Sequence, residues 1–314
     1  MARSTTQPKL YWQSKLVLLL VFPCLGADFV LKTRWWAVNL PTVALWTVGL
    51  SLLLGLVAWK LRAATPWAAV AGMAIAASIT YATLSGGDDR MFAPWRTALV
   101  PLVLLLLLTS LATRLGQTQK QQLGTAEKRQ GRSPAQVAAN LGVAALVSNQ
   151  AALFLLEGMG LLQLGFLHVH GMRGVFWSAT LPFALGLAAL AESAADTVSS
   201  EIGQVLGGNP RMLTTLRTVE PGTDGAISLI GTTAGIAAGA AVAAAGALAL
   251  SGNWEMFWIA CAGGVFGLFF DSLLGATLER RGWLNNDAVN FLSTASAAGF
   301  ALGLLALVSH QSIG

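Results

Sequence analysis

The sequence predicts an all-α, polytopic integral membrane protein, built as a helical bundle with about nine transmembrane helices and a cytoplasmic N-terminus. Hydrophobic residues make up 55% of the 314 residues, and only 11% are charged, which is less than half the charge of an ordinary soluble domain. The mean hydropathy is +0.64. Apolar runs of about 20 residues, the length that crosses a bilayer, recur along the whole chain.

Nine of these runs qualify as spans. The first follows a basic lead (Arg3, Lys9, Lys15), but no small-x-small cleavage site follows it, so we interpret it as a retained signal anchor rather than a signal peptide. The segment 158–170 is apolar but too short to cross, which predicts an interfacial or re-entrant piece. The expected spans are 15–31, 36–58, 66–85, 97–113, 135–157, 174–198, 225–250, 254–279 and 287–309.

The positive charges support this count. With nine spans, the N-terminus and the loops near 60, 114–134, 199–224 and 280–286 lie on one side of the membrane. Fourteen of the 19 Lys and Arg residues fall on that side and five on the other. Loops rich in Lys and Arg stay in the cytoplasm, so this side is predicted to be cytoplasmic.

The cysteines and histidines do not indicate a disulfide framework or a zinc site. The two cysteines, Cys24 and Cys261, lie in apolar runs and do not indicate a disulfide framework. The three histidines do not add ligands at the spacing of a zinc site.

Three polar clusters, by contrast, converge on the predicted cytoplasmic side. One lies at the end of the sixth span and reads ESAADTVSSEIG, 192–203. A second, GRSPAQVAANLG, 131–142, leads into the fifth span, and a third, 269–290, links the eighth and ninth spans. An acid within a span is costly in lipid and indicates function by default, so we expect the three clusters to form one site.

Helical spacing turns several of these acids inward. Glu192 and Asp196 are four residues apart and share a helix face. Small residues four apart let helices approach closely in lipid, so a glycine stripe that includes Asp271 would turn this acid toward the bundle. The stripe consists of Gly263, Gly267, Asp271, Gly275 and Glu279, whereas the similar stripe Gly231, Gly235, Gly239 and Ala243 is interpreted as helix packing alone.

Neighbouring carboxylates repel each other unless a cation neutralises them, and oxygen ligands suit Mg²⁺ or Mn²⁺. The alternative is that they are ordinary interfacial acids facing water, or a charge at a helix N-terminus in the case of Asp287. We predict catalytic roles for Asp196 and Asp271. The predicted metal ligands are Glu192, Asp196, Glu201, Asp271 and Asp287.

The loop after the sixth span predicts phosphate binding. The turn Pro221–Gly225 leads into a helix, and its backbone N–H groups with the helix N-terminus behind them favour anions. Such turns are common, and arginines in cytoplasmic loops also anchor lipid head groups, which is the alternative. The candidate phosphate-binding residues are Arg132, Asn140, Ser200, Arg211, Arg217, Gly222, Thr223, Gly225 and Asn290.

Acids for a metal beside arginines for phosphates favour phosphoryl transfer. Five ordered motifs then resemble a known membrane family. They are GRSPAQVAAN, SAADTVSSEIG, VEPGTDGAISLIG, FFDSLLGATLE and NNDAVNFLS, and they cover roughly 114–309. The family is that of domain of unknown function ninety-two, or transmembrane protein nineteen, which includes the plant phytyl-phosphate kinase. Asp196 with its serines and the PGTDG turn is also similar, more distantly, to CTP-dependent dolichol kinases and CDP-diacylglycerol synthases.

The resemblance implies a kinase that adds a second phosphate to an isoprenoid monophosphate, with Mg²⁺ or Mn²⁺ as cofactor and a nucleoside triphosphate, CTP favoured, as donor. It also divides the chain into N-terminal transmembrane helices, 1–113, and a catalytic transmembrane core, 114–314. The expected partners are the lipid substrate, the nucleotide and membrane lipids, without nucleic acid. The expected location is a bacterial inner membrane, with the site facing the cytoplasm. No oligomeric state is predicted.

Two alternatives remain open. A cytidylyltransferase that forms a CDP-lipid would use the same parts, and the sequence does not distinguish transfer of the γ-phosphoryl group from transfer of the nucleotidyl group. A secondary transporter would belong to another class. Transporters show internal repeats and broken helices with sites at the midplane. The sequence has no evident repeat, and its acids gather at one membrane face.

Overall fold

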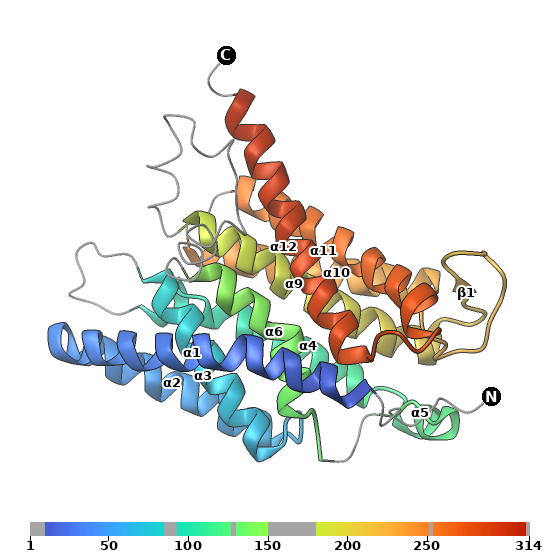
Figure 1. Cartoon of the computed structure of the whole chain (residues 1–314), viewed down its shortest axis with the longest axis horizontal. Coiled ribbons are helices and arrows are strands. Elements are labelled where there is room, and N and C mark those ends of the chain that lie inside the picture. Colours follow the sequence, from blue (N-terminus) through green and yellow to red (C-terminus); the bar gives the residue numbers. More distant parts are fainter. Residues whose placement is uncertain (1–9, 85–92, 127–129, 150–179, 251–253, 312–314) are drawn as a thin grey trace.

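The chain folds almost entirely into helices (Figure 1). The structure is a computed structural model that describes residues 10–84, 93–126, 130–149, 180–250 and 254–311. Its elements are α1 (Tyr11–Asn39), α2 (Pro41–Lys60), α3 (Pro66–Thr83), η2 (Pro94–Arg96), α4 (Leu99–Arg114), α5 (Gln117–Leu123), α6 (Pro134–Ser148), α9 (Thr180–Leu206), β1 (Arg211–Met212), β2 (Ala226–Ile227), α10 (Leu229–Leu250), α11 (Trp254–Leu274), the π-helical turn η4 (Gly275–Glu279) and α12 (Asn286–Gln311).

Within these residues, each of the nine expected spans contains a helix over all or part of its length. Five helices in the described ranges are long and apolar enough to cross a membrane: α1, α2, α10, α11 with η4, and α12. A sixth results if α4 and α5, bent by 65° at their junction, are one span, and α6 is a shorter apolar helix. The all-helical membrane fold is therefore confirmed, whereas nine spans and a cytoplasmic N-terminus stay predictions. The segment 158–170 lies outside the described residues.

Several predicted boundaries are wrong. The first helix continues to Asn39, so Lys32 and Arg34 lie within α1 rather than in a loop. Lys32 forms an ion pair at 3.1 Å with Asp28, one turn earlier in the same helix. The break comes at Pro41, because proline disfavours helical backbone at the preceding residue and cannot donate an amide hydrogen bond.

The loop expected over 199–224 is also shorter than predicted, because α9 extends to Leu206 and includes Glu201. The helix expected from 225 begins only at Leu229. Ser228 precedes it, and its Oγ accepts a hydrogen bond from Gly231 N at 3.1 Å, the usual role of a serine before a helix. Between α9 and α10, β1 and β2 form a two-stranded antiparallel sheet with Met212 opposite Ala226.

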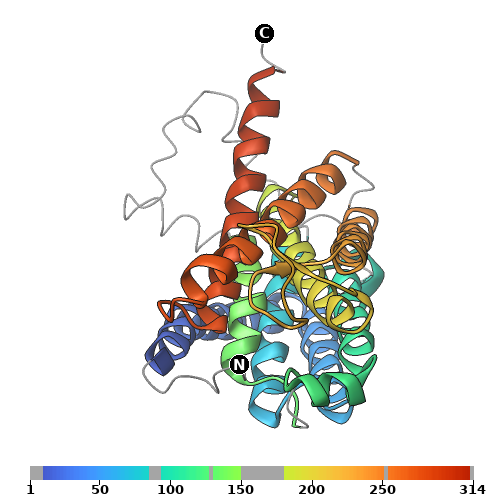
Figure 2. The same cartoon turned by 90° about the vertical axis from the view of Figure 1, so that its right-hand side faces the viewer.

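The most enclosed helix is α9, which lies inside the bundle in both views of the chain (Figures 1 and 2). It packs against α4, α6, α10, α11 and α12, and residues 183–195 are all buried. Small residues make this packing close. A Cβ atom at Gly235 would lie 2.5 Å from the carbonyl oxygen of Ala195, and one at Gly239 would lie 2.8 Å from that of Ala191. The interpretation of the α10 stripe as helix packing is confirmed.

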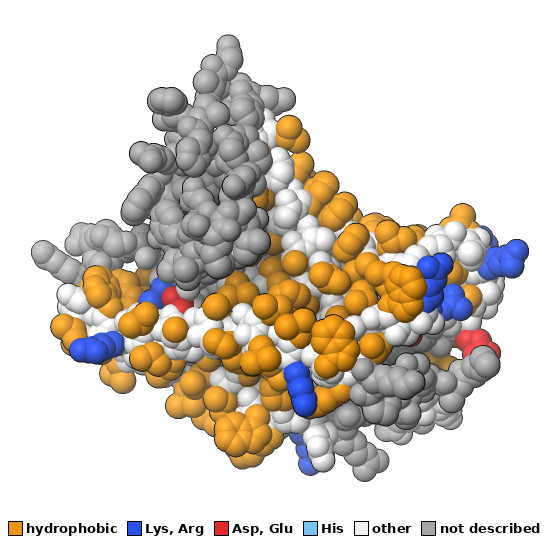
Figure 3. All heavy atoms as spheres, in the orientation of Figure 1, with side chains coloured by type: hydrophobic (Ala, Val, Ile, Leu, Met, Phe, Trp, Pro, Cys, Tyr) orange, Lys and Arg blue, Asp and Glu red, His pale blue; other side chains and the backbone are white. Residues whose placement is uncertain are grey.

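The outer surface differs in character from this centre. Among the side chains coloured by type in Figure 3, hydrophobic ones cover most of the face, and Lys and Arg side chains gather at its right-hand end with a few scattered elsewhere. Many large apolar side chains of α1 and α2 are exposed, among them Leu19, Val38, Leu45 and Leu53. Such a surface suits contact with lipid rather than with water.

One end of the bundle gathers the polar loops. Thr65 N donates to the carbonyl oxygen of Arg132, and Arg132 N donates to that of Ala63, each at 3.0 Å, so the turn after α2 pairs with the segment before α6. Gln119 in α5 donates to the carbonyl oxygen of Val205 at 3.4 Å.

Further contacts bring the remaining loops to the same end. Gly222 packs on Thr125 and Gly225 packs on Ala276. Asn285 N donates to Oε1 of Gln13 at 2.8 Å, which ties the loop before α12 to the start of α1. The segments that the charge distribution assigned to one side of the membrane therefore lie together.

Candidate functional site

The centre of the site is a pair of acids on α9. Glu192 is only 1% exposed, and Asp196 lies one turn nearer the polar end. Glu192 has room because its neighbour on α11 is a glycine: a Cβ atom at Gly267 would lie 2.5 Å from Cγ of Glu192. The glycine stripe of α11 thus allows the helices to close around a buried carboxylate.

Asp271 of α11 completes the cluster. Its carboxyl group is close enough to those of Asp196 and Glu192 to interact with them electrostatically, and Ser293 of α12 lies beside both Asp271 and Glu192. The prediction that the stripe turns Asp271 toward the bundle is confirmed. Three carboxyl groups from two helices therefore share one enclosed space, in which their negative charges repel each other.

Arg132 supplies a positive charge beside this cluster. It precedes α6, where Ser133 and Gln136 form a reciprocal capping box that determines where the helix begins. Its Nη2 donates to Oγ1 of Thr197 on α9 at 3.2 Å, and its charge acts on Asp196. Arg132, which the sequence predicts to bind phosphate, therefore lies beside the acid cluster.

A neutral polar network lies deeper in the bundle. The Oδ1 atom of Asn140 accepts hydrogen bonds from Ser193 Oγ at 3.4 Å and from Asn290 Nδ2 at 3.5 Å. Thr294 donates to the carbonyl oxygen of Ala139 at 3.3 Å. Helices α6, α9 and α12 are therefore connected beside the acids, and two of the predicted phosphate-binding residues, Asn140 and Asn290, contact each other.

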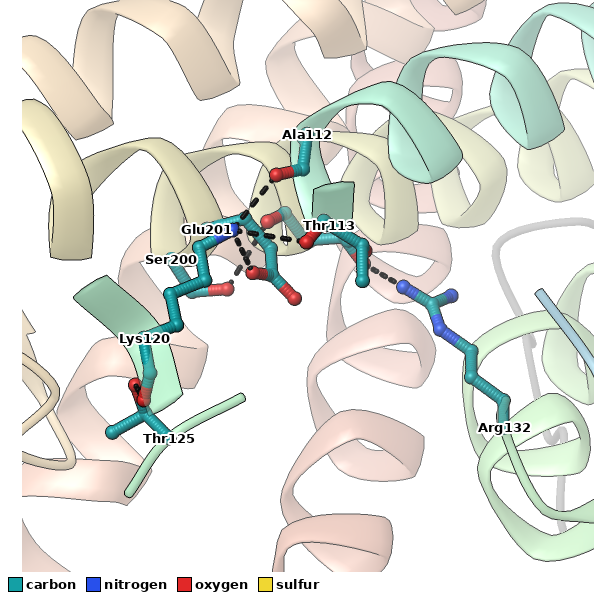
Figure 4. Close-up of polar contacts among 8 residues, drawn as sticks. Ala112, Thr113, Lys120, Thr125, Arg132, Ser200 and Glu201 are labelled. Carbon is teal, nitrogen blue, oxygen red and sulfur yellow. Dashed lines mark hydrogen bonds and ion pairs between the residues drawn. The ribbon is translucent and has the colours of Figure 1, made fainter. Parts of the chain in front are cut away.

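Glu201 is in a different environment from the other acids of α9. Its Oε2 lies 2.6 Å from Nζ of Lys120, which also donates to the carbonyl oxygens of Ala112 at 2.8 Å and Thr113 at 3.3 Å. Figure 4 shows Lys120 reaching these three acceptors, while Arg132 approaches from the other side of the view. Lys120 is fully buried. The predicted metal ligand Glu201 therefore already has a cationic partner.

The sequence analysis did not single out Lys120 or Ser293. Ser293 could have been found, because it follows Asn290 by three residues and lies on the same helix face. Lys120 belongs to the polar segment QTQKQQL, in which nothing distinguishes it from a solvated lysine.

Two other predicted residues have local partners. Asp287 accepts a hydrogen bond from Ser14 Oγ of α1 at 2.6 Å. Ser200 is exposed, and its Oγ donates to the carbonyl oxygen of Thr197 at 3.1 Å.

The loop that follows α9 lies over the end of α11. Gly222 and Gly225 both have positive φ angles, +83° and +74°, which favour glycine. Gly225 packs directly on Ala276 of the π-helical turn, and a Cβ atom at Gly275 would lie 2.7 Å from Gly225 N. The turn predicted to bind phosphate is thus anchored four residues beyond Asp271, where π-helical turns often mark functional sites.

The polar side chains of this loop differ in whether they are free to bind a ligand. The hydroxyl of Thr223 donates to the carbonyl oxygen of Glu220 at 2.7 Å. Arg211 and Arg217 are exposed, one on β1 and the other after the turn that follows it. Their guanidinium groups are therefore accessible to an anion from solution.

Magnesium binding at this cluster stays a prediction. Among the described residues, no three His, Cys, Asp or Glu side chains are arranged as a finished metal site. Mg²⁺, however, usually binds one or two carboxylates together with waters and substrate phosphates. The Oδ2 atom of Asp271 is buried and has no hydrogen-bond partner within the described ranges, so the cluster offers one carboxylate oxygen that is not already used.

Comparisons with known proteins agree with this architecture. The family model for integral membrane protein DUF92 matches residues 49–298. An uncharacterized membrane protein of Methanocaldococcus jannaschii is 40% identical over 119 residues, which is 38% of this chain and 49% of that protein. An uncharacterized membrane protein of Synechocystis is 33% identical over 219 residues, 67% of this chain and 74% of that protein.

A plant protein is also similar. Protein VTE6, chloroplastic, of Arabidopsis thaliana is 31% identical over 186 residues, 58% of this chain and 50% of the plant protein. The matches thus span about half of the archaeal and plant proteins and about three quarters of the cyanobacterial one. No solved structure was found to match the chain. Because the family model covers well over half of the chain and includes all the helices of the acid cluster, the chain belongs to the integral membrane protein DUF92 family.

Proposed function

We propose that this protein is an isoprenoid-phosphate kinase, which transfers a phosphoryl group from a nucleoside triphosphate, CTP favoured, to a lipid monophosphate and forms the diphosphate. The observation that carries the proposal is the meeting of Asp196 and Asp271, from separate helices, beside Arg132. We place the protein in a bacterial inner membrane, with this end of the bundle facing the cytoplasm, where nucleotide is available.

The similarity to the plant protein supports a kinase, since the family resemblance includes a plant phytyl-phosphate kinase. The surface of the protein supports a lipid substrate. A membrane-embedded bundle with exposed leucines gives an isoprenoid tail an apolar surface, while the phosphate of the lipid lies at the polar end of the bundle.

The reaction requires little acid–base chemistry. An oxygen of the lipid monophosphate bonds to the γ-phosphorus of the nucleotide, the bond from that phosphorus to the β-phosphate oxygen breaks, and the nucleoside diphosphate leaves. The attacking oxygen is largely ionised at neutral pH, because the second pKa of a phosphate monoester is about 6. No strong general base is needed, and the residues placed in the cluster within the described ranges are acids, an arginine and neutral polar side chains.

The residues of the cluster would orient and neutralise the phosphates. Asp196 and Asp271 would hold Mg²⁺ or Mn²⁺, which supplies positive charge to the transferring group. Arg132 would bind the phosphate nearest α9, and Arg211 and Arg217 would bind nucleotide phosphate from the loop. Glu192 is too enclosed to meet a nucleotide directly, so we assign it to positioning Asp196, one turn away on the same helix, rather than to direct contact with substrate.

The test is an assay of the purified protein with farnesyl or phytyl monophosphate, Mg²⁺ and each of the four nucleoside triphosphates, labelled separately on the α- and γ-phosphate. We expect label from the γ-phosphate in a lipid diphosphate. Label from the α-phosphate in the lipid would identify a cytidylyltransferase instead. Absence of transfer from every nucleotide, combined with uptake of solute by reconstituted vesicles, would favour a transporter and overturn the proposal.

A further inference from the structure

The outer face of α2 and α3 contains an apolar groove of about 200 Å³. It follows the two antiparallel helices from the middle of α2 to the turn that joins them. The two helices approach each other closely at Gly55, because a Cβ atom there would lie 2.9 Å from the carbonyl oxygen of Ala69. The residues that line the groove are Leu52, Leu56, Trp59, Pro66, Val70 and Met73, together with Gly55 and Ala69.

Cationic residues surround the end of the groove formed by Trp59 and Pro66. The ammonium group of Lys60 lies over the ring of Trp59, 5.3 Å from its centre. Arg114 extends from the end of α4, and its Nη2 donates to the carbonyl oxygen of Leu61 at 2.6 Å. Arg62 lies in the turn itself and is exposed.

The backbone of Arg62 is unusual. Its φ angle is +54°, in the left-handed region that side chains other than glycine and asparagine rarely adopt. A glycine would end α2 in this conformation without strain, so the arginine is present at a conformational cost. Residues held in such conformations are often found at functional sites.

The cationic end of the groove is continuous with the acid cluster through Arg132. The backbone of Arg132 pairs with Ala63 and Thr65 in the turn, while its side chain reaches Thr197 beside Asp196. A Cβ atom at Gly131 would lie 2.6 Å from the carbonyl oxygen of Arg62, so the two segments are in direct contact. One arginine side chain therefore spans the distance from the turn to α9.

We propose that this groove binds the isoprenoid tail of the lipid monophosphate, with the phosphate held among Lys60, Arg62, Arg114 and Arg132 before transfer. The inference rests on the proposed function and names where its lipid substrate binds. The groove ends beside Lys60, Arg62 and Arg114, and the side chain of Arg132 leads from the same turn to α9. This arrangement is complementary to a single-chain amphiphile with an anionic head. The groove is smaller than the roughly 300–1,000 Å³ of a pocket that encloses a whole drug-sized ligand, so it holds a section of the chain and leaves the rest in the bilayer.

Binding is tested without nucleotide. A farnesyl monophosphate analogue with a photoreactive diazirine on its terminal isoprene unit is irradiated with the full-length protein in nanodiscs. We expect labelled peptides from α2 and α3, and competition by farnesyl monophosphate but not by farnesol or phosphatidylglycerol. Competition by phosphatidylglycerol would identify a general site for anionic lipids. That result, labelling elsewhere or labelling at background would overturn the proposal.

Variants with a larger side chain in the groove provide a second test of the proposal. Leu56 lines the groove and is 43% exposed, whereas Leu53 on the same helix is 55% exposed but is not part of the lining. Leu56→Trp should reduce the labelling, and raise the KM for lipid phosphate, by about tenfold or more. Leu53→Trp is the matched control and should resemble the parent. Val70→Trp fills the groove from α3 and replaces Leu56→Trp if that variant fails to insert.

Arg62→Gly separates recognition from folding. The substitution relieves the positive φ angle, so thermal stability should be unchanged or higher, while the KM for lipid phosphate rises roughly twofold to fivefold. Arg96→Gly, at the other end of the bundle, should leave the KM unchanged. If the groove is labelled but no phosphoryl transfer occurs, the proposed kinase activity is refuted while the lipid-binding groove stands. If transfer occurs but is unaffected by Leu56→Trp and Val70→Trp, the groove is refuted as the lipid site while the kinase activity stands.

Discussion

Helices α2 and α9 show opposite relations between hydropathy and burial. The more apolar α2 has no acidic residue and exposes Leu45, Trp46 and Leu53. In contrast, α9 contains three acids and is buried over residues 183–195. In lipid, the apolar helix is stable at the surface, while the polar helix must be enclosed by others. The comparison shows that a helix with three acidic residues lies at the centre of the described bundle, while a helix without acidic residues lies at its surface.

A buried charged side chain destabilises the protein unless polar partners surround it. We expect the largest effect on stability from replacing Lys120. Lys120→Met should lower the free energy of unfolding by about 3–5 kcal/mol, because Glu201 and the carbonyl oxygens of Ala112 and Thr113 lose their common donor. Thermal unfolding in detergent measures the loss. The exposed Lys15→Met on α1 is the control. If the two variants are equally stable, the ion pair between Lys120 and Glu201 contributes no more to the free energy of unfolding than an exposed charge does.

A double variant sharpens the same test. Glu201→Gln removes the charge that Lys120→Met leaves unpaired, so the combination should recover part of the lost stability. Recovery measured by the same unfolding experiment would assign the loss to the buried carboxylate. A double variant less stable than either single variant would assign it to packing.

Asp196→Asn addresses the chemistry rather than the stability of α9. The substitution keeps the size of the side chain and removes one negative charge from the pair with Asp271. Loss of one preorganised electrostatic group typically lowers the rate by about 10²–10³. Folding and insertion should be preserved, because an amide is less costly near lipid than a carboxylate. The readout is the initial rate of phosphoryl transfer at increasing Mg²⁺, and partial recovery at high Mg²⁺ is expected.

Glu255→Gln is the matched control for Asp196→Asn. Glu255 is an exposed acid at the opposite end of α11 from Asp271, so its substitution should leave the rate unchanged. If the Asp196→Asn and Glu255→Gln variants transfer the phosphoryl group at the same rate, Asp196 is not part of the reaction centre.

The close approach of α11 to α9 predicts a smaller effect. Gly267→Ala would place a methyl group 2.5 Å from Cγ of Glu192 and 2.9 Å from Cβ of Ala297, so the helices must move apart. Such overpacking typically costs about 1–3 kcal/mol. Gly299→Ala in α12 meets no atom within 4 Å and should be neutral. Thermal unfolding of both variants is the measurement. A loss of stability in Gly267→Ala alone would show that this glycine makes room for Glu192, whereas equal stability of the two variants would show that it is replaceable like an ordinary helical residue.

The smallest effect is expected at the exposed loop. Arg211→Lys retains the charge but loses the bidentate geometry of the guanidinium group, so nucleotide binding should weaken by roughly twofold to fivefold. The KM for nucleotide measures the change, and Arg96→Lys, an exposed arginine at the other end of the bundle, is the matched control. Full activity of Arg211→Lys would indicate that this arginine anchors lipid head groups.

The sequence by itself predicted the helical membrane fold, because apolar runs long enough to cross a bilayer do not depend on tertiary contacts. Spacing also predicted that Asp271 turns inward and that the α10 stripe packs on a neighbour, since residues four apart share a face of any helix. Boundaries were less predictable. The ends of α1 and α9 depend on Pro41 and on contacts with other segments rather than on hydropathy.

Only the tertiary structure decided which acids stand together. Glu192, Asp196, Asp271 and Glu201 have similar sequence environments, yet three of them share one space while Glu201 is paired with Lys120. That pairing depends on a bend of 65° between α4 and α5, which brings a lysine from a polar segment under α9. The groove between α2 and α3 likewise depends on the close contact at Gly55. Local sequence determines which face a side chain occupies, but the partner it meets is determined by which helix packs against that face.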